Sequence, residues 1–218
     1  MLFPAYKEDK VIIPAIYSFL QQDYPRELYD IIVISDQMQE STNEALRQLP
    51  VRLLIADYTD SSKAKAMSLA MNATADIPYD AVVIMDADNT AGTSFLSELN
   101  PVFQSGARAV QAHRTAKNTN TDIAVLDAAS EEINNSIFRS GHIALGLSSA
   151  LIGSGMALEA CWFRQHIHLL ETAGEDKEME ALLLKQRIHI EYLEHVYVKD
   201  EKTQKKEGIK NQRKRWIA

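Results

Sequence analysis

The 218-residue sequence predicts an α/β fold with a mostly parallel sheet and flanking helices. Three continuous apolar runs, at residues 30–35, 51–56 and 81–85, are typical of strands that are covered on both faces. A weaker run at residues 107–112 predicts a fourth strand. Segments with helical periodicity separate these runs, and strands that alternate with helices form right-handed βαβ units with parallel strands.

Helices are expected between these strands. The first is marked by an apolar stripe made of Ile12, Ile16, Phe19 and Leu20. Pro14 is compatible with this helix because it falls in the first turn. Further helices are expected over residues 41–49, 62–73 and 94–103. The last of these begins after Ser94, a favourable residue for capping a helix.

The second half of the sequence is less regular. We expect a long helix over residues 122–138, a glycine-bearing turn over 151–157, a helix over 175–186 and a strand over 188–192. No linker-like segment separates the two halves, so the chain is expected to be a single domain with a soft boundary near residue 115.

The chain begins and ends abruptly. Only three residues precede Pro4, which leaves almost no room for a first strand, so we expect an unpaired position or a shifted edge in the sheet. The most apolar stretch, residues 143–158, contains Gly and Ser and is too short to span a bilayer. We expect the chain to be a fragment whose flanking membrane segments are absent.

Charge is unevenly distributed. The net charge of −7 excludes nucleic-acid binding by bulk attraction. Residues 199–215, however, hold eight Lys or Arg against three acids, a local charge of +5 that leaves −12 on the remainder. Such a tail favours an anionic partner, either a diphosphate or a membrane surface, although a solvated helix face would have the same composition. The single cysteine, Cys161, excludes an intrachain disulfide and is expected to be buried.

Acidic residues follow the predicted strands. Asp36, Asp57 and Asp86 lie at or just after the carboxyl ends of the first three apolar runs, the edge where open α/β sheets bind ligands. Asp86 and Asp88 form a D-x-D pair, and two carboxylates this close repel each other unless a cation offsets them. Mg²⁺ or Mn²⁺ prefers oxygen ligands and shares them with phosphates, so we expect a metal–diphosphate site. Two acids that cap a loop are the alternative interpretation.

Two further motifs lie in the second half. Glu175-Asp176 precedes a helix, where acids are favoured by the helix dipole, but a carboxylate there is also suited to take a proton from a sugar hydroxyl. The segment Gln212–Trp216 combines arginines, which bind phosphate in bidentate fashion, with an aromatic ring that can stack on a sugar. A basic helix end near a membrane is the alternative for this segment.

These motifs occur in a distinctive order, with Gly153-Ser154-Gly155 between the two acidic pairs. In this the chain resembles the family 2 glycosyltransferases of GT-A fold. The resemblance is strongest to the membrane-embedded, often processive polysaccharide synthases related to cellulose, hyaluronan and chitin synthases. It covers essentially the whole chain. It implies a Rossmann-like GT-A domain with a nucleotide-binding half, residues 1–115, and an acceptor-binding and catalytic half, residues 116–218.

The resemblance implies roles for individual residues. For the nucleotide, the matching residues are Pro4, Ala5, Tyr6 and Glu8 of a P-A-Y-N-E-like loop, Asp36, Lys63 of a K-A-x-A-L-N-like segment, and Asp86. Lys7 and Ser68 stand where this family usually has Asn. For the metal, Mg²⁺ or Mn²⁺, the matching residues are Asp86 and Asp88. For the acceptor and the diphosphate, they are Gly153, Ser154, Gly155, Gln212, Arg215 and Trp216. For catalysis, they are Asp176 as the base, with Glu175 beside it.

The implied reaction is an inverting sugar transfer. The donor would be a nucleotide-diphosphate sugar, with UDP expected, and the acceptor a saccharide or a lipid-linked saccharide in polysaccharide synthesis. The expected location is the cytoplasmic face of a bacterial inner or plasma membrane. One alternative is a nucleotidyltransferase, which shares an α/β nucleotide half and acidic metal ligands but does not need Q-x-x-R-W. Another is a non-catalytic module with a degenerate site, against which the presence of both acidic pairs argues.

Overall fold

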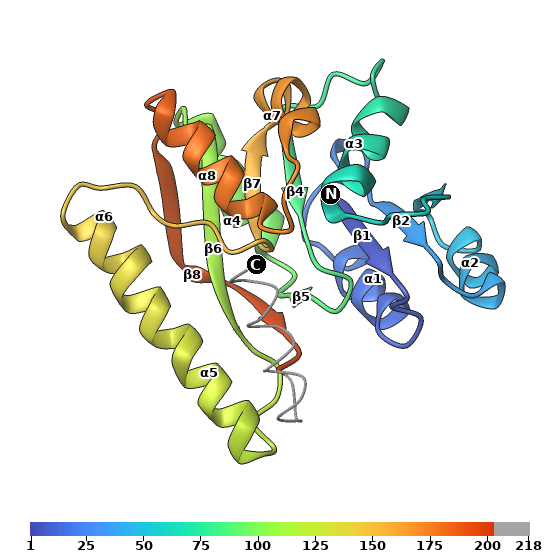
Figure 1. Ribbon diagram of the computed structural model, residues 1–218, viewed down its shortest axis with the longest axis horizontal. Coiled ribbons are helices and arrows are strands. Elements are labelled where there is room, and N and C mark those ends of the chain that lie inside the picture. The colour runs from blue at the N-terminus through green and yellow to red at the C-terminus, as the bar shows by residue number, and fades with distance from the viewer. Residues whose placement is uncertain (203–218) are drawn as a thin grey trace.

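The computed structural model describes residues 1–202, and in this part of the chain the strands form one eight-stranded sheet (Figure 1). The strand order across the sheet is β3-β2-β1-β4-β7-β6-β8-β5. The strands are β1 (Leu2–Tyr6), β2 (Ile32–Asp36), β3 (Arg52–Ala56), β4 (Ala81–Ile84), β5 (Thr90–Ala91), β6 (Ala109–Ala116), β7 (Met156–Glu159) and β8 (Ile190–Asp200). The predicted α/β fold is therefore confirmed.

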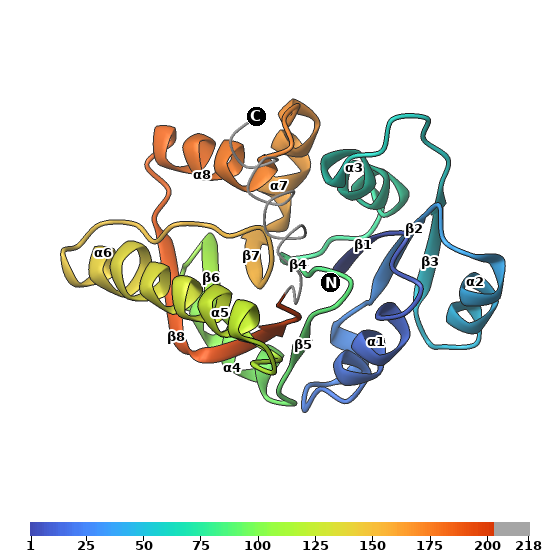
Figure 2. The same ribbon diagram turned by 60° about the horizontal axis from the view of Figure 1, so that its bottom comes forward.

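Helices connect these strands and cover both faces of the sheet (Figure 2). The α-helices are α1 (Ile12–Leu20), α2 (Glu40–Arg47), α3 (Lys63–Ala73), α4 (Phe95–Gln104), α5 (Asp122–Asn134), α6 (His142–Ala144), α7 (Ala160–His166) and α8 (Glu175–Lys185). A π-helical segment, η2 (Asn135–Gly141), joins α5 to α6, and short 3-10 turns occur at η1 (Arg26–Leu28) and η3 (Ile167–Leu169).

The alternation of side chains along the strands produces two apolar cores. Ile32 and Ile34 of β2 face one core with α3, α7 and α8, whereas Val33 faces the other with α1 and α4. Adjacent residues of a strand point to opposite faces, so a continuous apolar run is what a strand between two helical layers requires. The sheet is thus the middle of three layers.

The sheet is more mixed than the sequence suggested. Within residues 1–202, β1, β2, β3 and β4 are joined by parallel pairings, and β6 is parallel to β8. Strand β7 runs antiparallel to both β4 and β6, and β5 runs antiparallel to β8. A buried apolar run has the same composition in either direction, so the sequence pattern cannot report strand polarity.

The expectation of almost no first strand is wrong. β1 pairs in parallel with β2 over five positions, from Leu2↔Ile32 to Tyr6↔Asp36, and lies in the interior of the sheet. Five residues are enough because the neighbouring strands are equally short. β1 pairs with β4 only at Leu2↔Ile84, so Pro4, which lacks an N–H group, interrupts no further pairing on that side.

Other expectations also need correction. β5 and α7 were not expected, and β7 begins within the turn expected over residues 151–157. The strand expected over residues 188–192 extends to Asp200 because β8 pairs with the whole of β6, across a register shift between Ala112 and His113. Cys161 is exposed, contrary to expectation. It lies in a short helix that instead turns Trp162 and Phe163 into the core.

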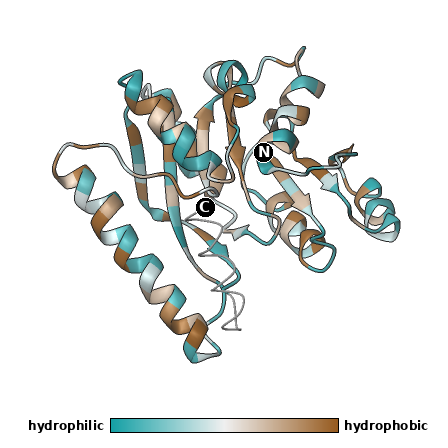
Figure 3. Ribbon diagram, viewed as in Figure 1, coloured by the Kyte–Doolittle hydropathy of each residue, from teal (hydrophilic) through white to brown (hydrophobic). Residues whose placement is uncertain are grey.

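Helix α5 and segment η2 together form a long helical rod along one side of the molecule, and they carry several exposed apolar side chains (Figure 3). These include Leu126, Ile133 and Ile137, which are more than half exposed. Nevertheless, among the described residues no helix is both long enough and apolar enough to cross a membrane.

Candidate functional site

The candidate site lies at the carboxyl ends of β1, β2 and β4, where parallel strands deliver their following residues to one edge of the sheet. Tyr6 and Asp36 end their strands opposite each other in the register. The chain then turns sharply in both loops: Lys7 and Gln37 have positive φ angles of 57° and 53°. The Lys7 N–H donates to the Asp36 carbonyl at 3.1 Å, which holds the two loops together.

The first loop presents an exposed aromatic ring beside acids. Tyr6 is 47% exposed, and the Lys7 ammonium lies 4.8 Å from its ring centroid. Asp36 is almost fully buried, yet its Oδ1 has no hydrogen-bond partner among the described residues. A buried carboxylate oxygen without a partner is uncommon and is available to a donor group of a ligand.

The D-x-D pair occupies a tight turn directly after β4. The Met85 N–H donates to the Leu2 carbonyl at 3.0 Å, so the strand ladder continues to the residue before Asp86. Asn89, which is fully buried, shapes the turn: its Oδ1 accepts from the Asp86 N–H at 3.0 Å and its Nδ2 donates to Asp88 at 3.2 Å. Sequence analysis missed Asn89, although Asn is a frequent turn residue.

Lys63 joins the two acidic pairs. Its Nζ lies 2.5 Å from Asp86 Oδ1 and 3.5 Å from Glu175 Oε1, and it donates to the Gly153 carbonyl at 2.7 Å. Burial disfavours the charged lysine, but the two carboxylates outweigh it and raise the pKa of Lys63. Burial would likewise raise the pKa of Asp86, but the Lys63 ammonium outweighs this effect, so the pKa of Asp86 is lowered. Lys63 therefore remains a cation and keeps Asp86 ionised.

Helix α8 brings the second acidic pair to this place. Glu175 is buried and begins the helix after Gly174, and Asp176 follows it. Burial raises the pKa of Glu175, and Lys63 offsets only part of that effect. Asp176 Oδ2 lies 3.7 Å from the point where a Cβ on Gly153 would sit. The structure therefore brings the expected Glu175-Asp176 pair to the Gly153 loop and to the lysine that binds Asp86.

The loop at residues 153–155 is held by a buried amide. Gln111 of β6 donates through Nε2 to the Ser154 carbonyl at 2.9 Å and accepts from the Ile152 N–H at 3.0 Å. Gly153 and Gly155 have φ angles of +77° and +64°, which glycine adopts without strain. A Cβ on Gly155 would also approach Val198 Cγ2 to 3.1 Å. Both glycines are thus required by the shape of the loop.

Negative charge accumulates at the mouth of the site. Burial and the Asp86 carboxylate raise the pKa of Asp88. Burial, Asp88 and Asp86 raise the pKa of Glu8. Carboxylates that raise each other's pKa are stabilised by a cation between them, and oxygen donors suit Mg²⁺ or Mn²⁺. Within residues 1–202 no group of three or more His, Cys, Asp or Glu side chains is arranged to hold a metal by itself.

Behind the site lies a buried charge cluster that sequence analysis did not detect. We define it as Arg114 of β6, Glu131 of α5, Arg139 of η2, and Asp200 and Lys202 at the end of β8. Lys117, also missed, donates to the Asp88 carbonyl at 2.6 Å. These residues are far apart in sequence and form no motif. The expected Gln212, Arg215 and Trp216 lie outside the described residues.

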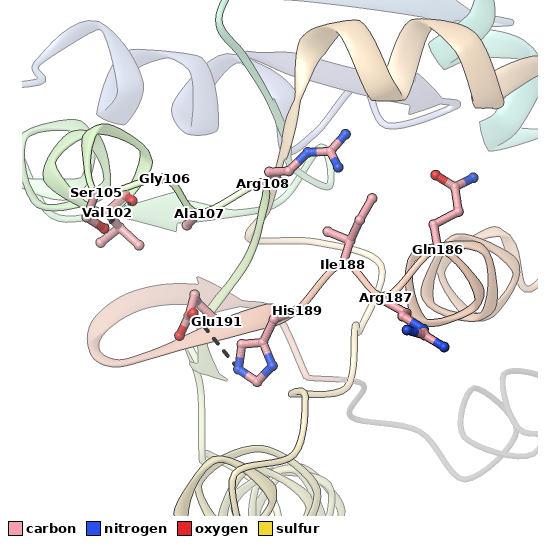
Figure 4. Close-up of a pocket in the computed structure, with 10 residues that line it drawn as sticks. All are labelled: Val102, Ser105, Gly106, Ala107, Arg108, Gln186, Arg187, Ile188, His189 and Glu191. Atoms are coloured by element: carbon pink, nitrogen blue, oxygen red, sulfur yellow. Dashed lines mark hydrogen bonds and ion pairs between the residues drawn. The ribbon is translucent and has the colours of Figure 1, made fainter.

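A cavity of about 480 Å³ among the described residues is not at this site. Figure 4 shows its lining, which comes from the end of α4 and the loop to β6, and from the segment between α8 and β8 with the start of β8. These segments lie at the starts of β6 and β8, whereas Lys117 and Asp200 lie at their ends. The cavity contains none of the expected site residues. The carboxylate site is the better functional candidate because its charges converge on one place.

Sequence comparison agrees with this geometry. The whole chain, residues 1–218, matches the protein family described as "Glycosyltransferase like family 2". The chain belongs to this family. None of the curated protein sequences matches it. The two acidic pairs, the glycine loop and Lys63 are thus the candidate site of a family 2 glycosyltransferase domain.

Solved structures share the fold of this family 2 domain. The mannosyltransferase PcManGT from Pyrobaculum calidifontis, in complex with GDP-Man and Mn²⁺, superposes with a TM-score of 0.68 at 17% identity, covering 99% of this chain and 59% of that one. S. aureus TarS 1-349 has a TM-score of 0.65 at 12% identity, covering 92% and 59%. The same fragment in complex with UDP-GlcNAc has a TM-score of 0.61 at 11% identity, covering 93% and 58%. This chain therefore spans less than two thirds of the structures it resembles.

Proposed function

We propose that the chain is a glycosyltransferase that transfers a sugar from a nucleotide-diphosphate donor, a UDP-sugar, to a saccharide or lipid-linked acceptor in polysaccharide synthesis. The observation that carries this proposal is the convergence on Lys63 of Asp86 from the first half and Glu175 from the second. This convergence supports the proposal of a diphosphate-binding acidic site next to the acidic pair that contains the proposed base. Neither acidic pair alone would support the proposal.

The donor site is proposed at Pro4, Ala5, Tyr6, Glu8, Asp36, Lys63 and Asp86. The exposed Tyr6 ring can stack on a base, and the unpartnered Asp36 Oδ1 can accept a hydrogen bond from a base or ribose. The structural neighbours bind such ligands: the TarS fragment is in complex with UDP-GlcNAc, and PcManGT is in complex with GDP-Man. We favour UDP for this chain because its first loop resembles those of UDP-sugar-dependent synthases.

A divalent cation, Mg²⁺ or Mn²⁺, is proposed on Asp88, with Asp86 as its neighbour. The residues fit such an ion because the carboxylates of Glu8, Asp86 and Asp88 repel one another, and among the described residues only Lys63 forms a direct ion pair with any of them. Asp86 is already paired with Lys63, so Asp88 is the more available ligand. When bound, the ion would neutralise charge on the departing diphosphate.

Asp176 is proposed as the general base, with Glu175 beside it. Asp176 takes the proton of the acceptor hydroxyl as its oxygen attacks the anomeric carbon, and the bond to the diphosphate breaks on the opposite side, so the configuration inverts. Lys63 separates this pair from Asp86 and limits the repulsion between the acids. Residues 153–155 form the proposed floor of the acceptor site. Gln212, Arg215 and Trp216 are proposed to contact the diphosphate and the acceptor, and the basic tail to favour a membrane surface.

The test is a thermal-shift screen of UDP- and GDP-sugars with and without Mn²⁺, followed by product analysis of the donor that stabilises the chain. Release of the nucleoside diphosphate is expected. Release of pyrophosphate from a nucleoside triphosphate and a sugar phosphate would identify a nucleotidyltransferase instead. Donor binding without any turnover or hydrolysis, in the presence of a panel of saccharide acceptors, would indicate a non-catalytic module.

A further inference from the structure

The buried charge cluster defined above connects two loops of the site. Arg114 donates through Nη1 to the Ile152 carbonyl at 2.9 Å, directly before the Gly153 loop. Lys202 donates its backbone N–H to Asn118 at 2.7 Å, and the preceding N–H, of Glu201, donates to Asp88 Oδ2 at 3.1 Å. The Arg114 guanidinium therefore holds the loop beside Asp176. The segment that contacts Asp88 carries Lys202, whose ammonium pairs with Glu131 and Asp200.

Glu131 is the residue shared by both contacts. Its Oε2 lies 2.7 Å from Arg114 Nη2 and 3.4 Å from Lys202 Nζ. Its Oε1 faces Arg139 at 3.8 Å. The side chain is only 10% exposed, and that of Lys202 is 4% exposed. Asp200 is the second acid, 2.9 Å from Lys202 Nζ and 3.6 Å from Arg114 Nε. Without the Glu131 charge, three cations would face a single carboxylate.

Such a cluster is difficult to explain by stability alone. Buried ion pairs rarely stabilise a fold more than apolar residues of similar size would, because removing charges from water is costly. A cluster that is satisfied only in one arrangement does, however, hold its members in a fixed geometry. In this chain Arg114 is bonded to Ile152, directly before the glycine loop, and Lys202 directly follows Glu201, which is bonded to Asp88.

We propose that Glu131 is a positioning residue that fixes residues 151–155 and 200–202 together. In this way it sets the orientation of Asp88 toward the metal-bound diphosphate. Glu131 itself lies on a helix that contributes none of the expected site residues. This inference rests on the proposed function. It differs from a purely structural role because it predicts a selective effect. Loss of the Glu131 charge weakens nucleotide binding that depends on the metal, and it leaves metal-independent binding of the nucleotide unchanged.

The test compares Glu131→Gln with Glu132→Gln. Glu132 is the adjacent residue on α5, but it contacts His113 and Thr115 and lies outside the cluster. Calorimetry with UDP, or with GDP if the wild type prefers it, is performed with and without Mn²⁺. For Glu131→Gln we expect Kd with Mn²⁺ to rise at least tenfold and Kd without Mn²⁺ to stay within twofold. For Glu132→Gln both values should equal those of the wild type.

A second variant keeps the test decisive if Glu131→Gln fails to fold. Lys202→Met retains the Glu131–Arg114 pair and removes the ion pair that ties residues 200–202 to Glu131, so it should show the same selective loss. A folded Glu131→Gln or Lys202→Met variant with wild-type Mn²⁺-dependent affinity would overturn the inference and leave the proposed function intact. A wild-type chain that binds neither nucleotide would overturn the proposed function, and the inference with it.

Discussion

The Lys63 ammonium lies 2.5 Å from the Asp86 carboxylate and 2.7 Å from the Gly153 carbonyl, so this side chain contacts residues 23 and 90 positions further along the chain. It is the only cation, among the described residues, that forms ion pairs with members of both acidic pairs. This contact explains how two acidic motifs can lie in one site without destabilising it.

Replacing Lys63 by Met should therefore destabilise the fold. Two partly buried carboxylates would lose their counter-ion, and we expect the free energy of unfolding to fall by about 3 kcal/mol. Lys65→Met is the matched control, because Lys65 is on the same helix but pairs with Asp60, whose side chain is 94% exposed. Its effect should stay within about 0.5 kcal/mol. Urea unfolding of both variants measures the difference, and equal losses would contradict the assigned role of Lys63.

The stability contributed by Glu131 should depend on pH. Burial would raise the pKa of Glu131, but Arg114 and Lys202 outweigh it and lower that pKa below the ordinary glutamate value of 4.5. The contribution is therefore complete above pH 4.5 and is lost as the pH falls through the lowered pKa. We expect the gap in unfolding free energy between wild type and Glu131→Gln to be about 3 kcal/mol at neutral pH and to shrink in acid. A gap that does not vary with pH would exclude this pairing.

Three glycines allow backbone strain to be separated from packing. A Cβ added to Gly146, with φ +73°, would have nothing within 4 Å, whereas at Gly155, with φ +64°, a Cβ would lie 3.1 Å from Val198. Gly146→Ala should cost about 1 kcal/mol through strain alone, and Gly155→Ala about 2–3 kcal/mol because a contact is added. Gly153→Ala, whose Cβ meets Asp176 at 3.7 Å, should resemble Gly146→Ala in stability. Thermal unfolding that ranks Gly146→Ala as the most damaging would refute this order.

Asp88 can be tested separately from Asp86. Asp88→Asn keeps the shape of the side chain but removes its charge, so we expect UDP binding to lose its dependence on Mn²⁺. Asp60→Asn is the control, since Asp60 is exposed and contacts Lys65. Calorimetry in the presence and absence of Mn²⁺ gives the comparison. If Asp88→Asn still binds UDP more tightly with Mn²⁺ than without it, the metal is held elsewhere.

Much of the fold is readable from local pattern. The apolar runs at residues 30–35, 51–56 and 81–85 correspond to β2, β3 and β4. Burial on both faces leaves this local signature in β2 and β4. β3 is an edge strand and is not covered on both faces as expected, since Ile55 is 52% exposed. Strand direction leaves no local signature in the sequence, so the sequence does not predict that β7 is antiparallel. β1 was underestimated because a strand of five residues can be central when its neighbours are equally short.

The site is readable only in part. Asp86 and Asp88 follow a buried strand, which predicts their edge of the sheet from physical reasoning alone. The position of Glu175-Asp176 next to Lys63 could not be derived in this way, because acids at a helix start are equally explained by the helix dipole. The roles of both pairs were assigned by family resemblance. No sequence pattern indicates the cluster of Glu131, Asp200 and Lys202, because their association depends on tertiary contacts between distant segments.

The proposed sugar transfer is tested best by nucleoside diphosphate release from the preferred nucleotide sugar, compared between the wild type and Asp176→Asn, with donor affinity measured in parallel. We predict acceptor-dependent release by the wild type. For Asp176→Asn we predict a loss of at least about a hundredfold, the contribution typical of a general base, with donor affinity unchanged. Asp60→Asn should behave as the wild type. Turnover by Asp176→Asn close to that of the wild type would contradict the proposed mechanism.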